Sequence, residues 1–201
     1  MSSENVGGVH DDGKLWGGRF TGGPDPALER ISRSPARSFE LAPEDVRGSI
    51  AHLGELERCG ILTADERATL ATALRQIGDD HVAGRIAPSE KDEDVHGYLE
   101  RTLIERVGAV GGKVRAGRSR NDQTSNDLRL WLRGRVPAIA ELLDELVQAL
   151  IARSVDAGDA IVPGFTHLQP AQPLLFGHQL LAHAQTLARD LRRLVAAWES
   201  S

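Results

Sequence analysis

The feature that most constrains the fold is a helical pattern that continues from Ser119 to about Ala157. About 38 helical residues span roughly 57 Å, and Pro137 is the position where we expect such a helix to kink. Its apolar residues recur at helical spacing and would form one stripe: Leu128, Leu132, Ile139, Leu142, Leu146 and Leu150.

A second long helix is expected after Pro173. Its apolar stripe repeats with a period near 3.5: Leu180, Leu181, Leu187, Leu191, Leu194, Val195 and Trp198. The rest of the chain is too short to cover two stripes of this length, and such stripes usually end in a helix bundle or an oligomer interface. We therefore expect the apolar seam of this helix to cause self-association.

Three shorter helices are expected upstream, over residues 43–60, 63–84 and 93–108. The first has a proline in its opening turn and a glycine after its end, and the second opens with the capping-box pattern of Thr63 and Glu66. Signals for β-strands are nearly absent. The sequence therefore predicts an all-α fold.

Three regions follow from these patterns. Residues 1–42 hold many glycines and prolines, and we interpret them as an extended arm with a flexible start. Residues 43–118 form a small helical domain, and residues 119–201 form the start of a bundle of long helices.

Composition narrows the class of protein. The net charge of −5 argues against a general nucleic-acid binder. The single cysteine, Cys59, allows no intrachain disulfide and fits a reducing cytoplasm; we expect a buried or half-buried structural thiol. The chain has neither a signal-peptide pattern nor an apolar run near the ~20 residues that cross a bilayer. These features predict a soluble, cytoplasmic protein.

The run from Arg118 to Gln123 is the first candidate site. If Ser119 caps the following helix, the backbone amides of Arg120 and Asn121 lie at its positive end, which suits a carboxylate. Arginines at that end oppose the helix dipole, so stability gives them no reason to gather there. Binding of a substrate carboxylate by Arg120 and of a substrate amide by Asn121 would supply one. The alternative is a solvated basic loop.

The loop Thr166–Gln169 lies between prolines and is expected to be a rigid connection between helices. His167 is its only side chain that exchanges a proton near neutral pH. The alternative is a structural loop histidine.

Asp92 and His96 lie four residues apart and could pair on a helix. The alternative is a capped helix start with a surface histidine. Two other histidines, His178 and His183, are five apart and do not share a helical face, so no metal site is expected.

Five segments, taken in order along the chain, resemble the argininosuccinate lyase branch of the fumarase/aspartase superfamily. They are Lys14–Phe20, Asp92–His96, Ala116–Gln123, Leu128–Arg133 and Pro163–Pro173. The resemblance implies the helical superfamily fold, with this chain holding the N-terminal domain and the first long helices of the central bundle.

The resemblance also implies a reaction, the β-elimination of argininosuccinate to arginine and fumarate, without metal or organic cofactor. Removing a proton beside a carboxylate builds negative charge that needs cationic and amide donors around it. By position in the family motifs, the catalytic, proton-handling residue is His167. The substrate-binding residues are Ser34, His96, Arg120, Asn121 and Thr166.

Two departures from the family pattern leave alternatives open. Ser38 stands where the family has an aspartate, and the later family loop that carries a catalytic serine has no match here. The family builds each active site from three subunits of a tetramer. The chain is therefore expected to be a lyase completed by other copies or by a chain with the missing half, a non-catalytic remnant, or a lyase of the same superfamily for another fumarate-releasing substrate.

Overall fold

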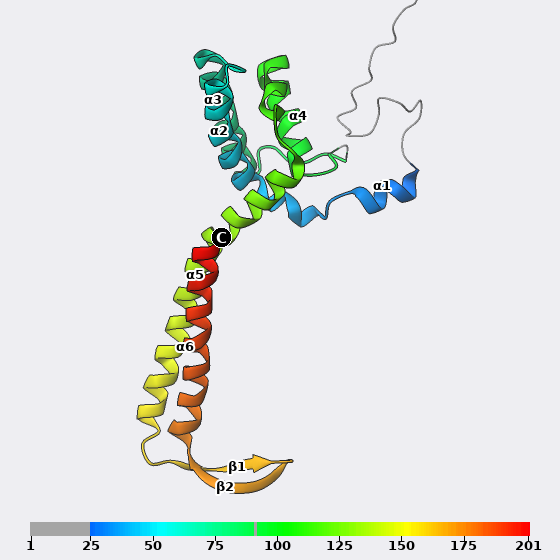
Figure 1. The fold of residues 1–201 in the computed structure, drawn as a ribbon. Helices are drawn as coiled ribbons and strands as arrows, with labels where there is room; N and C mark the ends of the chain where they lie inside the picture. Colours follow the sequence, from blue (N-terminus) through cyan, green and yellow to red (C-terminus); the bar gives the residue numbers. More distant parts are fainter. Residues whose placement is uncertain (1–24, 91) are drawn as a thin grey trace, which may run out of the picture. The chain divides into compact units, whose positions relative to one another are not determined.

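The computed structural model describes residues 25–90 and 92–201, and the chain divides into two compact units, residues 1–128 and 129–201. The predicted arm is described only from residue 25, where it contains two short helices. The segment Lys14–Phe20 lies outside the described residues. The elements of the first unit are α1 (Pro26–Ser32), η1 (Ala36–Leu41), α2 (Ala42–Arg58), α3 (Ala64–Val82), α4 (Val95–Val107), η2 (Gly108–Arg115) and the start of α5 (Arg120–Asp156) (Figure 1).

The core of the first unit lies between α2, α3 and α4. Each of these helices turns an apolar stripe inward, and each fully buried side chain of this kind contributes roughly 1.5–3 kcal/mol. The stripes meet in one cluster whose most deeply buried members are Leu53, Leu70, Leu74, Ile77, Tyr98 and Leu103. This packing fixes the helices that carry the candidate site.

The helix ends follow the predicted chemistry. Pro43 lies in the first turn of α2, and the Thr63 side chain and Glu66 form a complete capping box at the start of α3. Asp94 caps α4 by accepting a hydrogen bond from the Gly97 amide at 2.7 Å. Gly108 ends α4 with φ 75°, a conformation that favours glycine. The predicted helices of this unit are confirmed to within a few residues.

The expectation of a buried or half-buried Cys59 thiol was wrong. Cys59 is exposed, because it follows the last residue of α2 at the surface end of that helix.

The second unit contains the rest of α5, a hairpin of β1 (Ile161–Thr166) and β2 (Gln169–Leu175), and α6 (Phe176–Ser200). Both long helices were predicted, and α5 continues through Pro137. The antiparallel hairpin has Thr166 opposite Gln169 and an irregular register between Pro163 and Phe165. The sequence predicted a rigid connection between helices here, but not its two strands. Prolines cannot donate to a strand ladder, so these strands carry no ordinary strand pattern.

The chain reverses from α5 into α6 where two backbones approach closely. A Cβ atom on Gly177 would lie 2.7 Å from the carbonyl oxygen of Ser154. Only glycine fits at this point, so the start of α6 packs directly against the end of α5.

A residue of α6 satisfies a backbone carbonyl of α5 that Pro137 leaves without its helical hydrogen bond. Pro137 has no N–H, so the carbonyl of Arg133 lacks its usual partner four residues later. The Trp198 indole Nε1 donates to this carbonyl at 3.2 Å. The Arg133 guanidinium lies 4.3 Å from the Trp198 ring centroid and donates to the Trp198 carbonyl at 3.0 Å. One tryptophan thus satisfies the freed carbonyl and stacks with the cation beside it.

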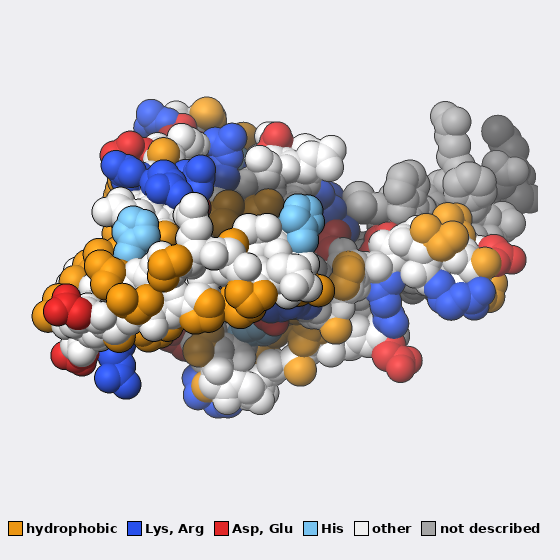
Figure 2. Space-filling model, turned by 90° about the horizontal axis from the view of Figure 1, so that it is seen from below, with side chains coloured by type: hydrophobic (Ala, Val, Ile, Leu, Met, Phe, Trp, Pro, Cys, Tyr) orange, Lys and Arg blue, Asp and Glu red, His pale blue; other side chains and the backbone are white. Residues whose placement is uncertain are grey.

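Apolar side chains remain exposed along both long helices and the hairpin. On the helices they are Leu128, Leu132, Ile139, Leu142, Leu146, Ile151 and Val155 of α5, and Phe176, Leu181, Val195 and Trp198 of α6. Figure 2, seen from below the view of Figure 1, shows hydrophobic side chains gathered on the visible face. Leu180, Leu187 and Leu191 of the predicted seam are half-buried, so the more exposed stripe belongs to α5. Among the described residues, no helix is long and apolar enough to cross a membrane.

The Trp198 contact predicts a thermodynamic coupling to Pro137. Trp198→Phe removes the indole donor and is expected to lower the free energy of unfolding by about 1 kcal/mol. In a Pro137→Ala background the Arg133 carbonyl regains a helical partner, so the same change should cost clearly less. Urea unfolding of the four chains measures the coupling, with Trp131→Phe as the matched control. Equal costs in both backgrounds would contradict this account of the contact.

The exposed stripe predicts self-association. Sedimentation over a concentration series is expected to show oligomers, and the double change Leu142→Glu and Leu146→Glu should weaken association at least tenfold by placing charges in the stripe. The control is Ile31→Glu, because Ile31 is exposed on α1. A monodisperse monomer at every concentration would refute the prediction.

Candidate functional site

The segment Arg118–Gln123 opens α5 as predicted. The Ser119 hydroxyl accepts a hydrogen bond from the Asn121 amide at 3.2 Å, and the Asp122 carboxylate accepts one from the Ser119 amide at 3.3 Å. The helix begins at Arg120. The exposed Asn121 therefore lies at the positive end of a helix of 37 residues, where an anion is favoured.

The two arginines of this segment are held by carboxylates and are not solvated surface charges. Arg118 donates to the Ser49 hydroxyl at 2.8 Å and lies 3.7 Å from an Asp45 carboxylate oxygen. Arg120 donates to Asp94 at 2.5 Å. Their side chains are only 11% and 13% exposed. The carboxylates offset the unfavourable position of the arginines at the start of a helix.

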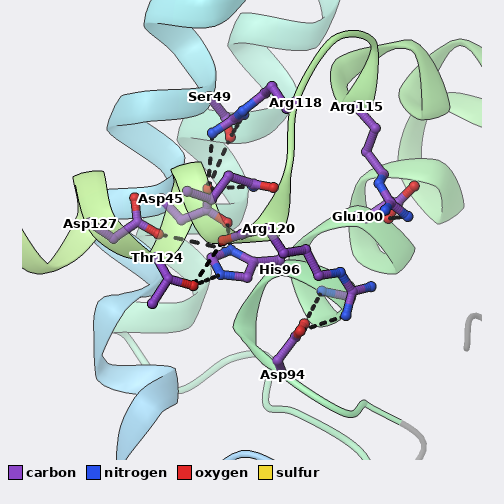
Figure 3. Close-up of polar contacts among 12 residues, drawn as sticks. Asp45, Ser49, Asp94, His96, Glu100, Arg115, Arg118, Arg120, Thr124 and Asp127 are labelled. Atoms are coloured by element: carbon purple, nitrogen blue, oxygen red, sulfur yellow. Dashed lines mark hydrogen bonds and ion pairs between the residues drawn. The ribbon is translucent and has the colours of Figure 1, made fainter. Parts of the chain in front are cut away.

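Asp45 of α2 is the centre of a buried polar network (Figure 3). Its Oδ2 lies 3.1 Å from Nδ1 of His96. Its Oδ1 accepts hydrogen bonds from Nε2 of Gln123 at 3.1 Å and from the Ser49 hydroxyl at 3.2 Å. Burial alone would raise the Asp45 pKa, but the contacts with His96 and Gln123 and the Arg118 charge hold it below its usual value.

His96 is buried in this network, and both of its ring nitrogens are engaged. Nδ1 faces Asp45, and Nε2 lies 3.0 Å from the Thr124 hydroxyl. The predicted pair with Asp92 was wrong, as was the surface-histidine alternative. Asp92 instead accepts two hydrogen bonds from Arg101, at 2.8 and 2.7 Å. His96 instead contacts Asp45, 51 residues away in the sequence, because His96 lies on the inward face of α4, which packs against α2.

Asp127, one helical turn after Gln123, is the least satisfied member of the cluster. It is fully buried, and neither of its carboxylate oxygens has a hydrogen-bond partner in the described part of the chain. Its Oδ2 lies 3.9 Å from Nδ1 of His96. Burial, with the charge of Asp45 added, raises the pKa of Asp127 to about 7.

Asp45, His96 and Asp127 each offer one ligand atom, and these atoms lie within 4.8 Å of one another. A divalent metal is bound by such donors. Here, however, the Asp45 and His96 ligand atoms are already hydrogen-bonded to each other, and the Arg118 guanidinium supplies positive charge 3.7 Å from Asp45. A hydrogen-bonded ionic network accounts for the arrangement.

Ser34 lies at the edge of the same unit. Its backbone amide donates to the Glu93 carbonyl at 3.0 Å, and the Glu93 carboxylate lies 4.0 Å from an Arg120 nitrogen. The structure therefore places Ser34, His96 and Arg120 within one connected set of contacts in the first unit.

Thr166 and His167 belong to the second unit, at the tip of the hairpin. His167 and Leu168 form a two-residue turn with φ values of 49° and 63°. Such a turn normally contains asparagine and glycine, because other residues are strained at positive φ. Leu168 is 93% exposed. His167 and Leu168 thus occupy a turn whose backbone conformation favours other residues.

Sequence reasoning missed Asp45, Ser49 and Asp127. The signal was present: Asp45 and Ser49 lie on the same helical stripe as the buried Leu53 and Leu56. A polar residue on an apolar stripe is informative because it must find buried partners.

Comparisons with known proteins agree on one family. Residues 18–200 match the family model described as "Lyase". The chain is 55% identical over 182 residues to argininosuccinate lyase 1 of Pseudomonas fluorescens (strain Pf0-1), covering 90% of this chain and 38% of that protein. It is 51% identical over 186 residues to the argininosuccinate lyase of Mycobacteroides abscessus, covering 92% and 39%. The chain thus spans about two fifths of the length of these relatives.

Solved structures give the same fold. EDDS lyase in complex with formate matches with a TM-score of 0.66 at 27% identity, over 89% of this chain and 35% of that one. A fumarate lyase:delta crystallin from Brucella melitensis matches with a TM-score of 0.68 at 19% identity, over 86% and 45%. The second likeness concerns the fold alone.

The raised pKa of Asp127 predicts how stability depends on pH. The folded chain holds a proton that the unfolded chain releases near 3.8. This contribution is therefore fully present below about pH 4 and is lost as the pH rises through about 7. Asp127→Asn, neutral at every pH, should remove this dependence and raise the free energy of unfolding at pH 8 by roughly 1–4 kcal/mol.

Denaturant unfolding between pH 5 and pH 8 measures this effect, with Asp79→Asn as the control because Asp79 is exposed on α3. A parallel pH dependence of wild type and Asp127→Asn would show that Asp127 is ionised throughout.

Proposed function

Because the chain belongs to the lyase family, whose model matches residues 18–200, we propose that it carries part of the active site of an argininosuccinate lyase. The reaction is the elimination of fumarate from argininosuccinate, with arginine as the other product. The observation that carries the proposal is the identity of 55% and 51% to two argininosuccinate lyases over nine tenths of this chain.

The start of α5 supports the carboxylate-binding part of this function. Proton removal beside a carboxylate shifts negative charge onto that carboxylate in the transition state, where cationic and N–H donors stabilise it. Arg120 is anchored at one nitrogen by Asp94, and its buried Nε has no hydrogen-bond partner among the described residues. Asn121 is exposed beside it. Arg120 and Asn121 therefore bind the succinyl part of the substrate in this proposal, with Ser34 and Thr166 as further donors.

His96 takes a different place in the proposal. Because both of its ring nitrogens are engaged, it acts on the substrate only if the Thr124 hydroxyl yields its place at Nε2. Otherwise His96 supports the first turns of α5 through its contact with the Thr124 hydroxyl.

His167 handles the proton in this proposal. A non-glycine residue at positive φ costs on the order of 1 kcal/mol, and strained turns of this kind are common at active sites. The strained position of His167 and Leu168 supports a role in chemistry, because stability alone favours other residues there.

Assembly is part of the proposal. The exposed apolar stripes of α5 and α6 support a homo-oligomer, tetrameric as in the family that the chain resembles, or association with a chain that supplies further parts of the site. The single cysteine of this chain and a biosynthetic role in making arginine favour the cytoplasm.

One observation favours a second candidate, a lyase for another fumarate-releasing substrate. Ser38 stands where the family has an aspartate, and its hydroxyl donates to the Pro35 carbonyl at 2.7 Å. A neutral hydroxyl that is engaged with the backbone gives no ion pair to the guanidinium end of argininosuccinate.

Fumarate release from argininosuccinate, followed by absorbance, tests the proposal. The chain alone is expected to release little, and mixing it with a chain that carries the remaining part of an argininosuccinate lyase should restore release. In the restored complex His167→Asn should slow release at least 100-fold, because asparagine cannot exchange the proton yet tolerates the positive φ.

The matched control is His183→Asn, on the exposed side of α6. A His167→Asn rate within threefold of wild type would remove His167 from the mechanism. Release of fumarate from another substrate, with argininosuccinate inert, would move the chain to the second candidate. No release from any mixture would indicate a non-catalytic remnant.

A further inference from the structure

Three separate parts of the first unit converge on one carboxylate. Asp45 of α2 contacts His96 of α4 at 3.1 Å, Gln123 in the first turn of α5 at 3.1 Å, and the Arg118 guanidinium at 3.7 Å. Figure 3 shows His96 and Arg118 beside Asp45, each from a different part of the chain. Ser49, one turn later on α2, joins Asp45 to Arg118 through its hydroxyl.

The contacts of Asp45 lie on both sides of the proposed substrate-binding residues. Arg118 precedes Arg120 and Asn121, and Gln123 follows them. We infer that Asp45 is a positioning residue, which fixes the backbone between Arg118 and Gln123 so that Arg120 and Asn121 present their donors to a carboxylate substrate. This inference deepens the proposed function and rests on it for the identity of the ligand.

The face of α2 beside Asp45 has a glycine, Gly48, where it meets α5. A Cβ atom on Gly48 would lie 2.8 Å from the side-chain amide nitrogen Nδ2 of Asn126 and 3.7 Å from an Asp127 carboxylate oxygen. The absence of a side chain at Gly48 leaves room for these two side chains of α5 against α2. From this face of α2, Asp45 contacts both flanks of the segment.

Charge explains why a carboxylate is needed at this point. The start of a helix repels cations, and Arg118 and Arg120 both lie there. Asp94 compensates Arg120 from α4, and Asp45 compensates Arg118 from α2. An amide in place of Asp45 keeps the shape of the side chain but removes the charge that holds Arg118.

The test compares Asp45→Asn with Asp127→Asn in the full chain. Both changes replace a buried carboxylate of the same cluster by an isosteric amide, but Asp127 makes no hydrogen bond to the segment. The readout is the backbone ¹⁵N order parameter of each residue. For Asp45→Asn we expect the order parameters of residues 118–123 to fall from about 0.85 toward about 0.6, while those of α3 stay high. For Asp127→Asn we expect no change in either segment.

Ser49→Ala provides a milder second variant, because it removes the Arg118 hydrogen bond and leaves the charge of Asp45 in place. Ser49→Ala should lower the order parameters of residues 118–120, and it tests the inference even if Asp45→Asn fails to fold. Equal loosening of α3 and the segment, or a rigid segment in both Asp45→Asn and Ser49→Ala, would overturn the inference.

A second arm separates this inference from the proposed function. In the complex that releases fumarate, Asp45→Asn should raise KM for argininosuccinate at least tenfold more than Asp127→Asn does, with a smaller change in kcat. A loosened segment, together with no fumarate release from any mixture with a chain that carries the remaining part, would support the positioning role and reject the assignment of an active lyase. An unchanged KM beside a loosened segment would show that the segment does not bind this substrate.

Discussion

The buried charge of Asp45 is the constraint on which the first unit depends. A carboxylate taken out of water is costly unless donors and cations surround it, and local residues on α2 supply only the Ser49 hydroxyl. The remaining partners come from elsewhere: His96 from α4 and Gln123 from α5. Satisfying one charge therefore fixes the relation between three helices, which hydrophobic packing alone would specify less uniquely.

The two units hold their candidate residues in different ways. In the first, the groups proposed to bind the carboxylate are supported by ion pairs, such as Arg120 with Asp94. In the second, His167 is held by backbone geometry, in a turn whose φ of 49° a histidine adopts at a cost. Charge networks suit groups that must bind an anion, since they set its electrostatic surroundings. A tight turn suits a proton carrier, since it places the imidazole at the tip of the hairpin.

Local signals predicted much of the fold, and distant contacts explain what they missed. The Thr63 and Glu66 capping box and Gly108 marked helix ends correctly, because caps depend on neighbours within four residues. The β1–β2 hairpin was missed because Pro163 and Pro173 face each other in it. His96 was assigned the wrong partner for the opposite reason, since its true partner is 51 residues away and no spacing rule reaches that far.

The long helix α5 connects the candidate site to assembly. Arg120 stands at its first residue, and exposed Leu142 and Leu146 lie further along it. Under the proposed function, a partner that covers this stripe contacts the same helix whose first residues are Arg120 and Asn121. Trp198 of α6 donates to the Arg133 carbonyl that Pro137 leaves without its helical partner, and α5 continues through Pro137. The proposed assembly gives a physical reason for the exposed stripe, because a covering partner would remove its apolar side chains from water.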